Sequence, residues 1–318
     1  MKDIMTLAFT FPGQGSQSIG MGKLLSETFA SSRAVFEEIN DALDQNLSKL
    51  MWDGPIEDLT LTSNTQPALM ACGIAAMQAL KDEFDIDVSR AKFVAGHSLG
   101  EYTALCAAGS LSLADTARLL RIRGNAMQAA VPVGAGAMAA LLGASVEDAE
   151  AAAKAGQSKG ICQIANDNAT GQIVLSGEKI AVQAACDAAT EMGVKKVMML
   201  NVSAPFHCEM MAPAAEAMKD ALADVKFNSP VVPVVNNVQA RPVSDPDQLR
   251  QDLVTQVTGR VRWRESVEWM HENGLETLAE PGCGKVLTVM LRRIVKGMKG
   301  VTLDTPEKLD AFASELKG

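Results

Sequence analysis

The pentad Gly96-His97-Ser98-Leu99-Gly100 constrains the fold of this chain more than any other segment. It follows the short apolar run 92–95 and precedes a helix-like segment that ends at Gly109. A G-x-S-x-G pattern between a strand and a helix is typical of a nucleophile elbow, because only glycine fits on either side of so sharp a turn. The turn exposes the serine hydroxyl at a helix N-terminus, where developing negative charge is stabilised. Ser98 is therefore the candidate nucleophile of an acyl transfer.

A serine nucleophile needs a proton acceptor, and the chain has three histidines. His97 adjoins Ser98, but neighbours on a tight turn point in different directions, so we expect His97 to line the pocket. His271 lies in a polar amphipathic stretch that is typical of a solvated helix face. His207 follows the apolar run 197–200 on a loop that contains proline, a favourable place for catalysis. We predict that His207 is the base, and the alternative is a structural loop histidine.

Arg123 puts a charge on the apolar face of a predicted helix. The helix begins with a capping box at Ser112 and runs to about Met127. The apolar residues that share a face with Arg123 are Leu113, Leu119, Leu120 and Met127. A buried guanidinium needs a carboxylate partner. That partner is either an internal Asp or Glu, or a carboxylate that arrives with the substrate and accepts two parallel hydrogen bonds.

A second glycine-rich turn, Gly13-Gln14-Gly15, follows the apolar run 5–9, which we expect to be the first strand. The turn lacks the lysine and the spacing of a P-loop, so it does not indicate nucleotide binding. At the carboxyl end of a strand, such a turn can direct backbone N–H groups and an amide toward an oxyanion.

Length and composition exclude several classes of protein. A chain of 318 residues buries a large core and is long enough for two units. It has no run of about 18 apolar residues and no signal-peptide pattern, so we expect no membrane segment. The six cysteines form no C-x-x-C pair, which indicates reduced residues of a cytoplasmic protein and no metal site. The net charge of −9 argues against nucleic-acid binding.

Strand and helix patterns alternate along most of the chain, which predicts an α/β fold with a parallel sheet. One stretch differs, with expected helices at 146–155 and 180–192 and expected strands at 137–142, 161–165, 172–175 and 195–200. The order β-α-β-β-α-β is ferredoxin-like, with an Asn-rich turn at 166–172. We therefore predict a large, parallel-sheet α/β hydrolase-like subdomain at 1–130 and 204–318, with an inserted ferredoxin-like subdomain at 131–203. The ligand site is expected in the cleft between them.

Five segments carry a resemblance that runs nearly from end to end. In chain order they are 12–17 (PGQGSQ), 96–102 (GHSLGEY), Arg123-Gly124 with Met127-Gln128, 204–207 (APFH), and Pro281-Gly282 with 284–287 (GKVL). With these segments in this order, the chain resembles the malonyl-CoA:acyl carrier protein transacylases of fatty-acid synthesis.

The resemblance implies roles for individual residues. Ser98 would carry the acyl group, and His207 would be its base. In such enzymes a backbone carbonyl usually orients the histidine, and the matching position is Gln256. Arg123 would bind the free carboxylate of the malonyl group. The residues implied for the oxyanion hole are Gln14 and Leu99, through their backbone N–H groups, and the further pocket residues are His97, Asn166 and Phe206.

The expected reaction is a ping-pong transfer of malonyl from malonyl-CoA to acyl carrier protein through a malonyl-serine ester, with no cofactor. One alternative is a serine hydrolase or thioesterase, in which water takes the acyl group. Another is a non-catalytic acyl-carrier scaffold. The carrier protein is generally acidic, so we expect a local basic docking patch. The candidate is the stretch 291–299 with Arg292 and Arg293, and Lys195-Lys196 is a second candidate; an ordinary solvated helix face is the alternative.

Overall fold

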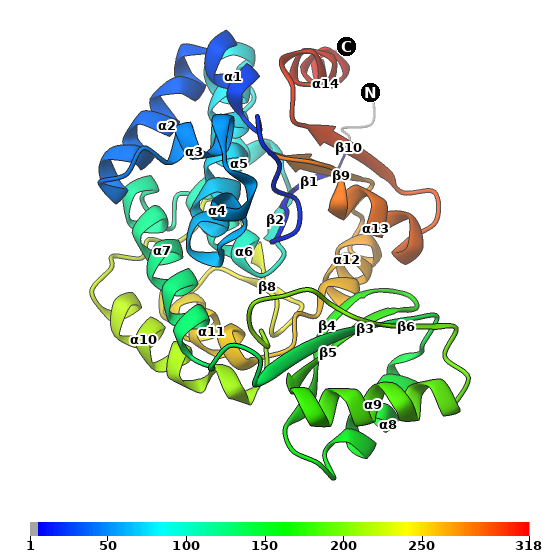
Figure 1. The fold of residues 1–318 in the computed structure, drawn as a ribbon. Coiled ribbons are helices and arrows are strands. Elements are labelled where there is room, and N and C mark those ends of the chain that lie inside the picture. Colours follow the sequence, from blue (N-terminus) through cyan, green and yellow to red (C-terminus); the bar gives the residue numbers. More distant parts are fainter. Residues whose placement is uncertain (1–5, 318) are drawn as a thin grey trace.

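Two β-sheets organise residues 6–317, the part of the chain that the computed structural model describes (Figure 1). The larger sheet has the strand order β10-β9-β1-β2-β7-β8. Its strands are β1 (Leu7–Phe11), β2 (Phe93–Gly96), β7 (Val234–Val235), β8 (Pro242–Val243), β9 (Thr277–Pro281) and β10 (Lys299–Leu303). All neighbours pair in parallel except the short β8, which runs antiparallel to β7. The expected first strand is thus confirmed with shifted bounds, and Met5 lies outside the described residues.

The central strands β1, β2 and β7 of the larger sheet are buried on both faces, which explains why they read as largely apolar runs. In β1, Leu7, Phe9 and Phe11 pack into the main core, whereas Ala8 packs with Trp263 on the other face. The helices of this unit are α1 (Lys23–Thr28), α2 (Ala30–Leu43), α3 (Leu47–Asp53), α4 (Ile56–Thr60), α5 (Thr62–Phe84), α6 (Leu99–Ala107), α7 (Leu113–Ala129), α10 (Ala212–Ala223), α11 (Pro246–Thr258), α12 (Trp263–Glu272), α13 (Val286–Ile294) and α14 (Pro306–Lys317), with 3₁₀ turns at Val88–Arg90 and Glu209–Met211.

The second sheet is antiparallel and has the order β4-β5-β3-β6, which is the ferredoxin-like arrangement. Its strands are β3 (Gly136–Leu142), β4 (Cys162–Ala169), β5 (Gln172–Glu178) and β6 (Lys196–Met199), and its helices are α8 (Val146–Gly156) and α9 (Lys179–Glu191). In β3, Ala137, Ala139 and Leu141 pack with residues of α8 and α9, and Met138 packs with Phe206 instead. Figure 1 shows the two helices on the face of this sheet that is turned away from the larger unit. The other face therefore contributes to the junction between the sheets.

The sequence prediction for the Asn-rich segment was wrong. Residues 166–169 continue β4 rather than forming a turn, and only Thr170 and Gly171 connect β4 to β5. The strand extends because Asn166, Asp167 and Asn168 are buried against the larger unit, where they find polar partners. The prediction of an α/β fold with a ferredoxin-like insertion is confirmed, and the boundaries at 130/131 and 203/204 stay a prediction.

The segment 165–168 joins the two sheets beside the candidate active site described below. The Asp167 N–H donates to the Val261 carbonyl at 2.9 Å, and the Val261 N–H donates to the Ala165 carbonyl at 2.8 Å. The fully buried carboxylate of Asp167 also binds Arg260 at 2.9 Å and Arg264 at 2.8 Å. These bonds fix β4 against the loop before α12.

Among the described helices, none combines the length and the apolar character that a membrane span needs.

Candidate active site

Ser98 occupies a strained turn between β2 and α6. Its backbone has φ 54° and ψ −111°, a conformation that residues other than glycine rarely adopt. A Cβ atom on Gly96 would lie 1.9 Å from the Gly100 carbonyl, and one on Gly100 would lie 2.2 Å from the Phe11 oxygen. Both flanking positions thus require glycine, as the pentad predicts. The Ser98 N–H donates to Oδ1 of Asn237 at 2.7 Å, which holds the turn from outside the motif.

Ser98 and His207 form a hydrogen-bonded pair. The Ser98 Oγ lies 2.8 Å from Nε2 of His207, and the opposite ring nitrogen, Nδ1, lies 2.9 Å from the backbone oxygen of Gln256. A carbonyl can only accept, so Nδ1 carries the hydrogen and Nε2 is left as the acceptor. Burial, and then the charge of Arg123, lower the pKa of His207 to about 3. The imidazole is therefore neutral near pH 7 and can take a proton from Ser98.

Arg123 lies on the buried face of α7, as its position among the leucines predicts, and it is only 1% exposed. Its Nη1 donates to Oε1 of Gln66 at 2.8 Å, and its Nη2 donates to Oε1 of Gln256 at 2.9 Å and to the Ser98 Oγ at 3.1 Å. Within residues 6–317, no carboxylate lies within ion-pair distance of this guanidinium. The sequence left open whether an internal carboxylate pairs with Arg123. The structure shows two neutral amides, those of Gln66 and Gln256, in that place.

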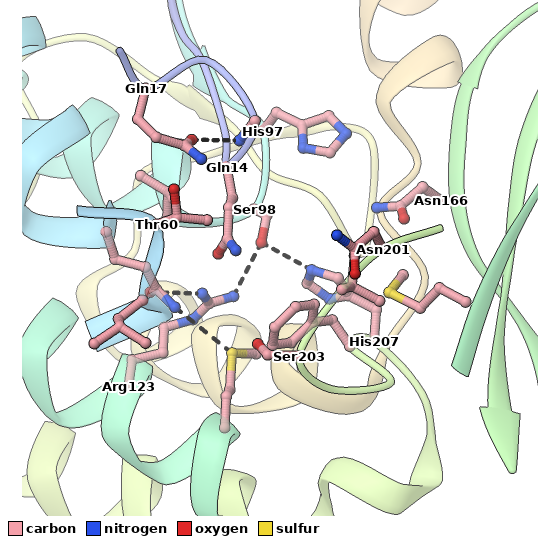
Figure 2. A pocket seen from close by; sticks show the side chains of 18 of the residues that line it. Gln14, Gln17, Thr60, His97, Ser98, Arg123, Asn166, Asn201, Ser203 and His207 are labelled. Carbon is pink, nitrogen blue, oxygen red and sulfur yellow. Dashed lines mark hydrogen bonds between the residues drawn. The ribbon is translucent and has the colours of Figure 1, made fainter. Parts of the chain in front are cut away.

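A cavity of about 480 Å³ opens over these three side chains. Figure 2 shows Arg123 and His207 approaching Ser98 from different sides, with Gln14 near the serine. Leu99 is the first residue of α6, so its N–H belongs to the first helical turn and has no partner within the helix. The further sequence-predicted residues that line this cavity are Gln14, His97, Asn166 and Phe206, and the loop 201–203 lines its other side. The cavity therefore brings together a serine hydroxyl, a neutral imidazole, an N–H of the first turn of α6 and a guanidinium without a carboxylate partner in the described residues.

The side chains of His97 and His271 make no hydrogen bond to Ser98 in the described residues. Nε2 of His97 lies 2.7 Å from Oδ1 of Asn168, and its ring packs near Trp263 with centroids 5.9 Å apart. Burial lowers the pKa of His97. His271 is exposed on α12, where its Nδ1 contacts the Leu275 carbonyl at 3.1 Å. In the described part of the chain, no group of three His, Cys, Asp or Glu side chains is arranged to hold a metal ion.

The comparisons with known proteins agree with this geometry. Residues 8–303 match the acyl transferase domain family. A Bacillus subtilis (strain 168) protein named malonyl CoA-acyl carrier protein transacylase is 40% identical to this chain, over 98% of this chain and 97% of its own length. The chain belongs to the malonyl-CoA:acyl carrier protein transacylase family. The resemblance found in the sequence is thus confirmed.

Solved structures of this transacylase family share the fold. An acyl-carrier-protein-S-malonyltransferase from Bartonella henselae has a TM-score of 0.96 and 55% identity, and the match covers 99% of this chain and 100% of that chain. A malonyl-transacylase solved in complex with its type II PKS acyl-carrier protein has a TM-score of 0.94 and 38% identity, with 98% of this chain and 99% of that chain covered.

Sequence reasoning missed two residues that hydrogen-bond to the candidate site residues. Gln66 supplies one of the two amides on Arg123, and it is a buried polar residue inside the apolar helix α5. Asn237 binds the Ser98 N–H with Oδ1 and donates from Nδ2 to the Gly96 carbonyl at 2.7 Å. A signal existed for Asn237, because the pair Asn236-Asn237 follows an apolar run at the end of a strand. No comparable pattern marks Gln66.

Proposed function

We propose that this protein transfers the malonyl group of malonyl-CoA to the phosphopantetheine thiol of acyl carrier protein in fatty-acid biosynthesis. The observation that carries the proposal is the meeting of two groups on the Ser98 Oγ, a neutral imidazole at 2.8 Å and a guanidinium without a carboxylate partner at 3.1 Å. The first activates a nucleophile and the second binds an anion. Together they suit an acyl donor that carries its own carboxylate.

In the first half-reaction, His207 takes the hydroxyl proton of Ser98 while Oγ attacks the thioester carbonyl carbon. The oxyanion accepts hydrogen bonds from the backbone N–H groups of Gln14 and Leu99. The C–S bond then breaks, and His207 returns the proton to the CoA sulfur, which leaves as the thiol. A malonyl ester remains on Ser98, with its carboxylate on Arg123.

The second half-reaction is the reverse with another thiol. His207 takes the proton of the phosphopantetheine thiol, whose sulfur attacks the ester carbonyl. The proton finally returns to the Oγ of Ser98, so the enzyme is regenerated without a cofactor. The backbone carbonyl of Gln256 keeps Nδ1 protonated throughout and orients the ring.

The roles of the remaining pocket residues follow from their places. Phe206 and Asn166 form the pocket wall beside the base, and His97 is held in that wall by Asn168.

We further propose that the protein works in the cytoplasm. All six cysteines are free and none is exposed, which suits a reducing compartment.

Mass spectrometry after mixing with malonyl-CoA tests the proposal. A malonyl adduct on Ser98 that persists in water and disappears when a phosphopantetheine thiol is added supports transfer. An adduct that water removes at the same rate without the thiol indicates the serine hydrolase alternative. The absence of any adduct would leave the non-catalytic acyl-carrier scaffold as the remaining alternative.

A further inference from the structure

Two opposite charges are buried beside the elbow without forming an ion pair. The guanidinium of Arg123 donates only to neutral oxygens within the described residues. Glu101, in the first turn of α6, is fully buried. Its Oε2 accepts from the Asn237 N–H at 2.7 Å and from Nε2 of Gln256 at 3.1 Å. Its Oε1 has no partner in the described part of the chain.

A single amide connects these two charges. Gln256 donates from Nε2 to the Glu101 carboxylate and accepts at Oε1 from Nη2 of Arg123 at 2.9 Å. The orientation of the amide is fixed, because a guanidinium can only donate and an ionised carboxylate can only accept. The backbone oxygen of the same residue binds His207. Gln256 therefore links the buried carboxylate to both groups that contact the Ser98 hydroxyl.

We propose that Glu101 is the counter-charge of Arg123 in the unloaded enzyme, acting through the Gln256 amide, and that it takes up a proton when the malonyl carboxylate binds. This inference rests on the proposed function, because it requires a substrate anion at Arg123. Glu101 touches no reacting atom, so it is a positioning residue. The free Oε1 can accept the proton without breaking either hydrogen bond to Oε2.

The charges around Glu101 support this exchange. Burial raises the pKa of Glu101 to about 7, although the hydrogen bonds from Asn237 and Gln256 lower it. The nearby anion of Asp252 on α11 also raises this pKa, and the charge of Arg123 on α7 lowers it. Tyr102, the next residue of α6, is buried with a pKa raised to about 12, so it stays neutral. A substrate carboxylate offsets the charge of Arg123. That removes one of the influences that favour ionised Glu101, so the equilibrium of the carboxyl group shifts toward the protonated form.

The sign of the pH dependence follows from this linkage. Above about pH 7 the loaded enzyme binds more protons than the unloaded enzyme, so a rise in pH disfavours loading with malonyl. Below about pH 7 both states are protonated and the effect vanishes. The loss is at most about tenfold per pH unit for one proton. Acetyl-CoA carries no second anion, so its use does not depend on Glu101 in this way.

The first test is the ratio of kcat/KM for malonyl-CoA to kcat/KM for acetyl-CoA between about pH 6 and pH 9. Ionisations that affect both substrates, including those of CoA and His207, cancel in this ratio. The wild-type ratio should be flat at low pH and fall above about pH 7. In Glu101→Gln, which copies the protonated carboxyl group in shape and charge, the ratio should stay flat. An equal fall in the variant would overturn the proposal.

Asp252→Asn serves as the matched variant, because it removes a different buried carboxylate from the same surroundings. Since Asp252 raises the pKa of Glu101, its neutralisation should shift the fall in the ratio to lower pH. A flat ratio in Asp252→Asn, together with a fall in Glu101→Gln, would assign the proton to Asp252 and overturn the proposal.

A measurement on the wild type avoids any folding defect of the variants. Transfer of malonyl from CoA to Ser98 moves the serine proton to the CoA sulfur and by itself exchanges no proton with solvent. In weak buffer slightly above pH 7, we therefore expect net proton uptake on loading with malonyl-CoA and none with acetyl-CoA, with mass spectra recorded on the same samples. A malonyl adduct without proton uptake would overturn the role of Glu101. No adduct with either substrate would instead overturn the proposed function.

Discussion

Nη2 of Arg123 donates a hydrogen bond of 3.1 Å to the Ser98 Oγ. The group proposed to bind the substrate carboxylate therefore touches the nucleophile itself. A malonyl group carries its carboxylate one methylene away from the thioester carbonyl, so both ends must be recognised within a few ångströms. The contact between these two residues matches that short separation, and it leads to the predictions below.

Ser98→Ala should abolish transfer and leave the fold intact. Loss of the nucleophile lowers the transfer rate by about 10³-fold or more. The substitution also removes few packing contacts, because the hydroxyl faces the cavity. Stopped-flow transfer assays measure the rate, and a thermal melt checks the fold. Substantial transfer in this variant would remove Ser98 from its role.

Arg123→Ala should cripple the use of malonyl-CoA and leave acetyl-CoA equal or better as a substrate. Losing one partner of a buried, hydrogen-bonded charge pair costs about 2–5 kcal/mol. The kcat/KM values for the two substrates measure the difference directly. Since the guanidinium also contacts Gln66 and Gln256, an equal decline with both substrates would mean that Arg123 is structural.

The use of acetyl-CoA should not decline as the pH falls from about 7 to about 5. An ordinary histidine with a pKa near 6.5 would become protonated in this range and lose its ability to accept a proton. The pKa of His207 is lowered to about 3, so the imidazole stays neutral. Acetyl loading rates across this range provide the check, and a decline with an apparent pKa of 6 to 7 would contradict the prediction.

Asp167→Asn should destabilise the fold by about 1–3 kcal/mol. Breaking a buried ion pair costs about 3–5 kcal/mol, but here both arginine partners are partly exposed and water screens part of the loss. Urea unfolding measures the change in the free energy of unfolding. The control is Asp187→Asn on the exposed side of α9, which should be neutral. Equal stability of the two variants would show that the junction does not depend on this cluster.

Charge reversal at Arg292 and Arg293 should raise KM for acyl carrier protein and leave loading from malonyl-CoA almost unchanged. Both residues are exposed in the last turn of α13. Reversal at Lys195 and Lys196, which are also exposed, is the matched comparison. An unchanged KM in the first variant and a raised KM in the second would move the docking surface to the smaller sheet. Slower loading from CoA would instead put these arginines near the CoA phosphates.

The sequence by itself determined the elements that depend on local sterics and patterning. The elbow follows from Gly96 and Gly100, because any Cβ there would collide with the backbone. The charge of Arg123 on an apolar helix face marked it as exceptional before any partner was known. The order of strands and helices likewise indicated the α/β fold and the ferredoxin-like insertion.

Only the tertiary structure decided which groups meet those residues. Gln66 and Gln256 reach Arg123 across 57 and 133 positions of the chain, and Asn237 reaches Ser98 across 139. No local period encodes such partners. The sequence therefore left open whether the carboxylate partner of Arg123 is internal or arrives with the substrate, and the structure shows two amides beside the guanidinium. The Asn-rich segment was mistaken for a turn for the same reason. Asparagine favours turns when its side chain is solvated, but Asn168 is buried against His97, and this long-range hydrogen bond belongs to an extended strand.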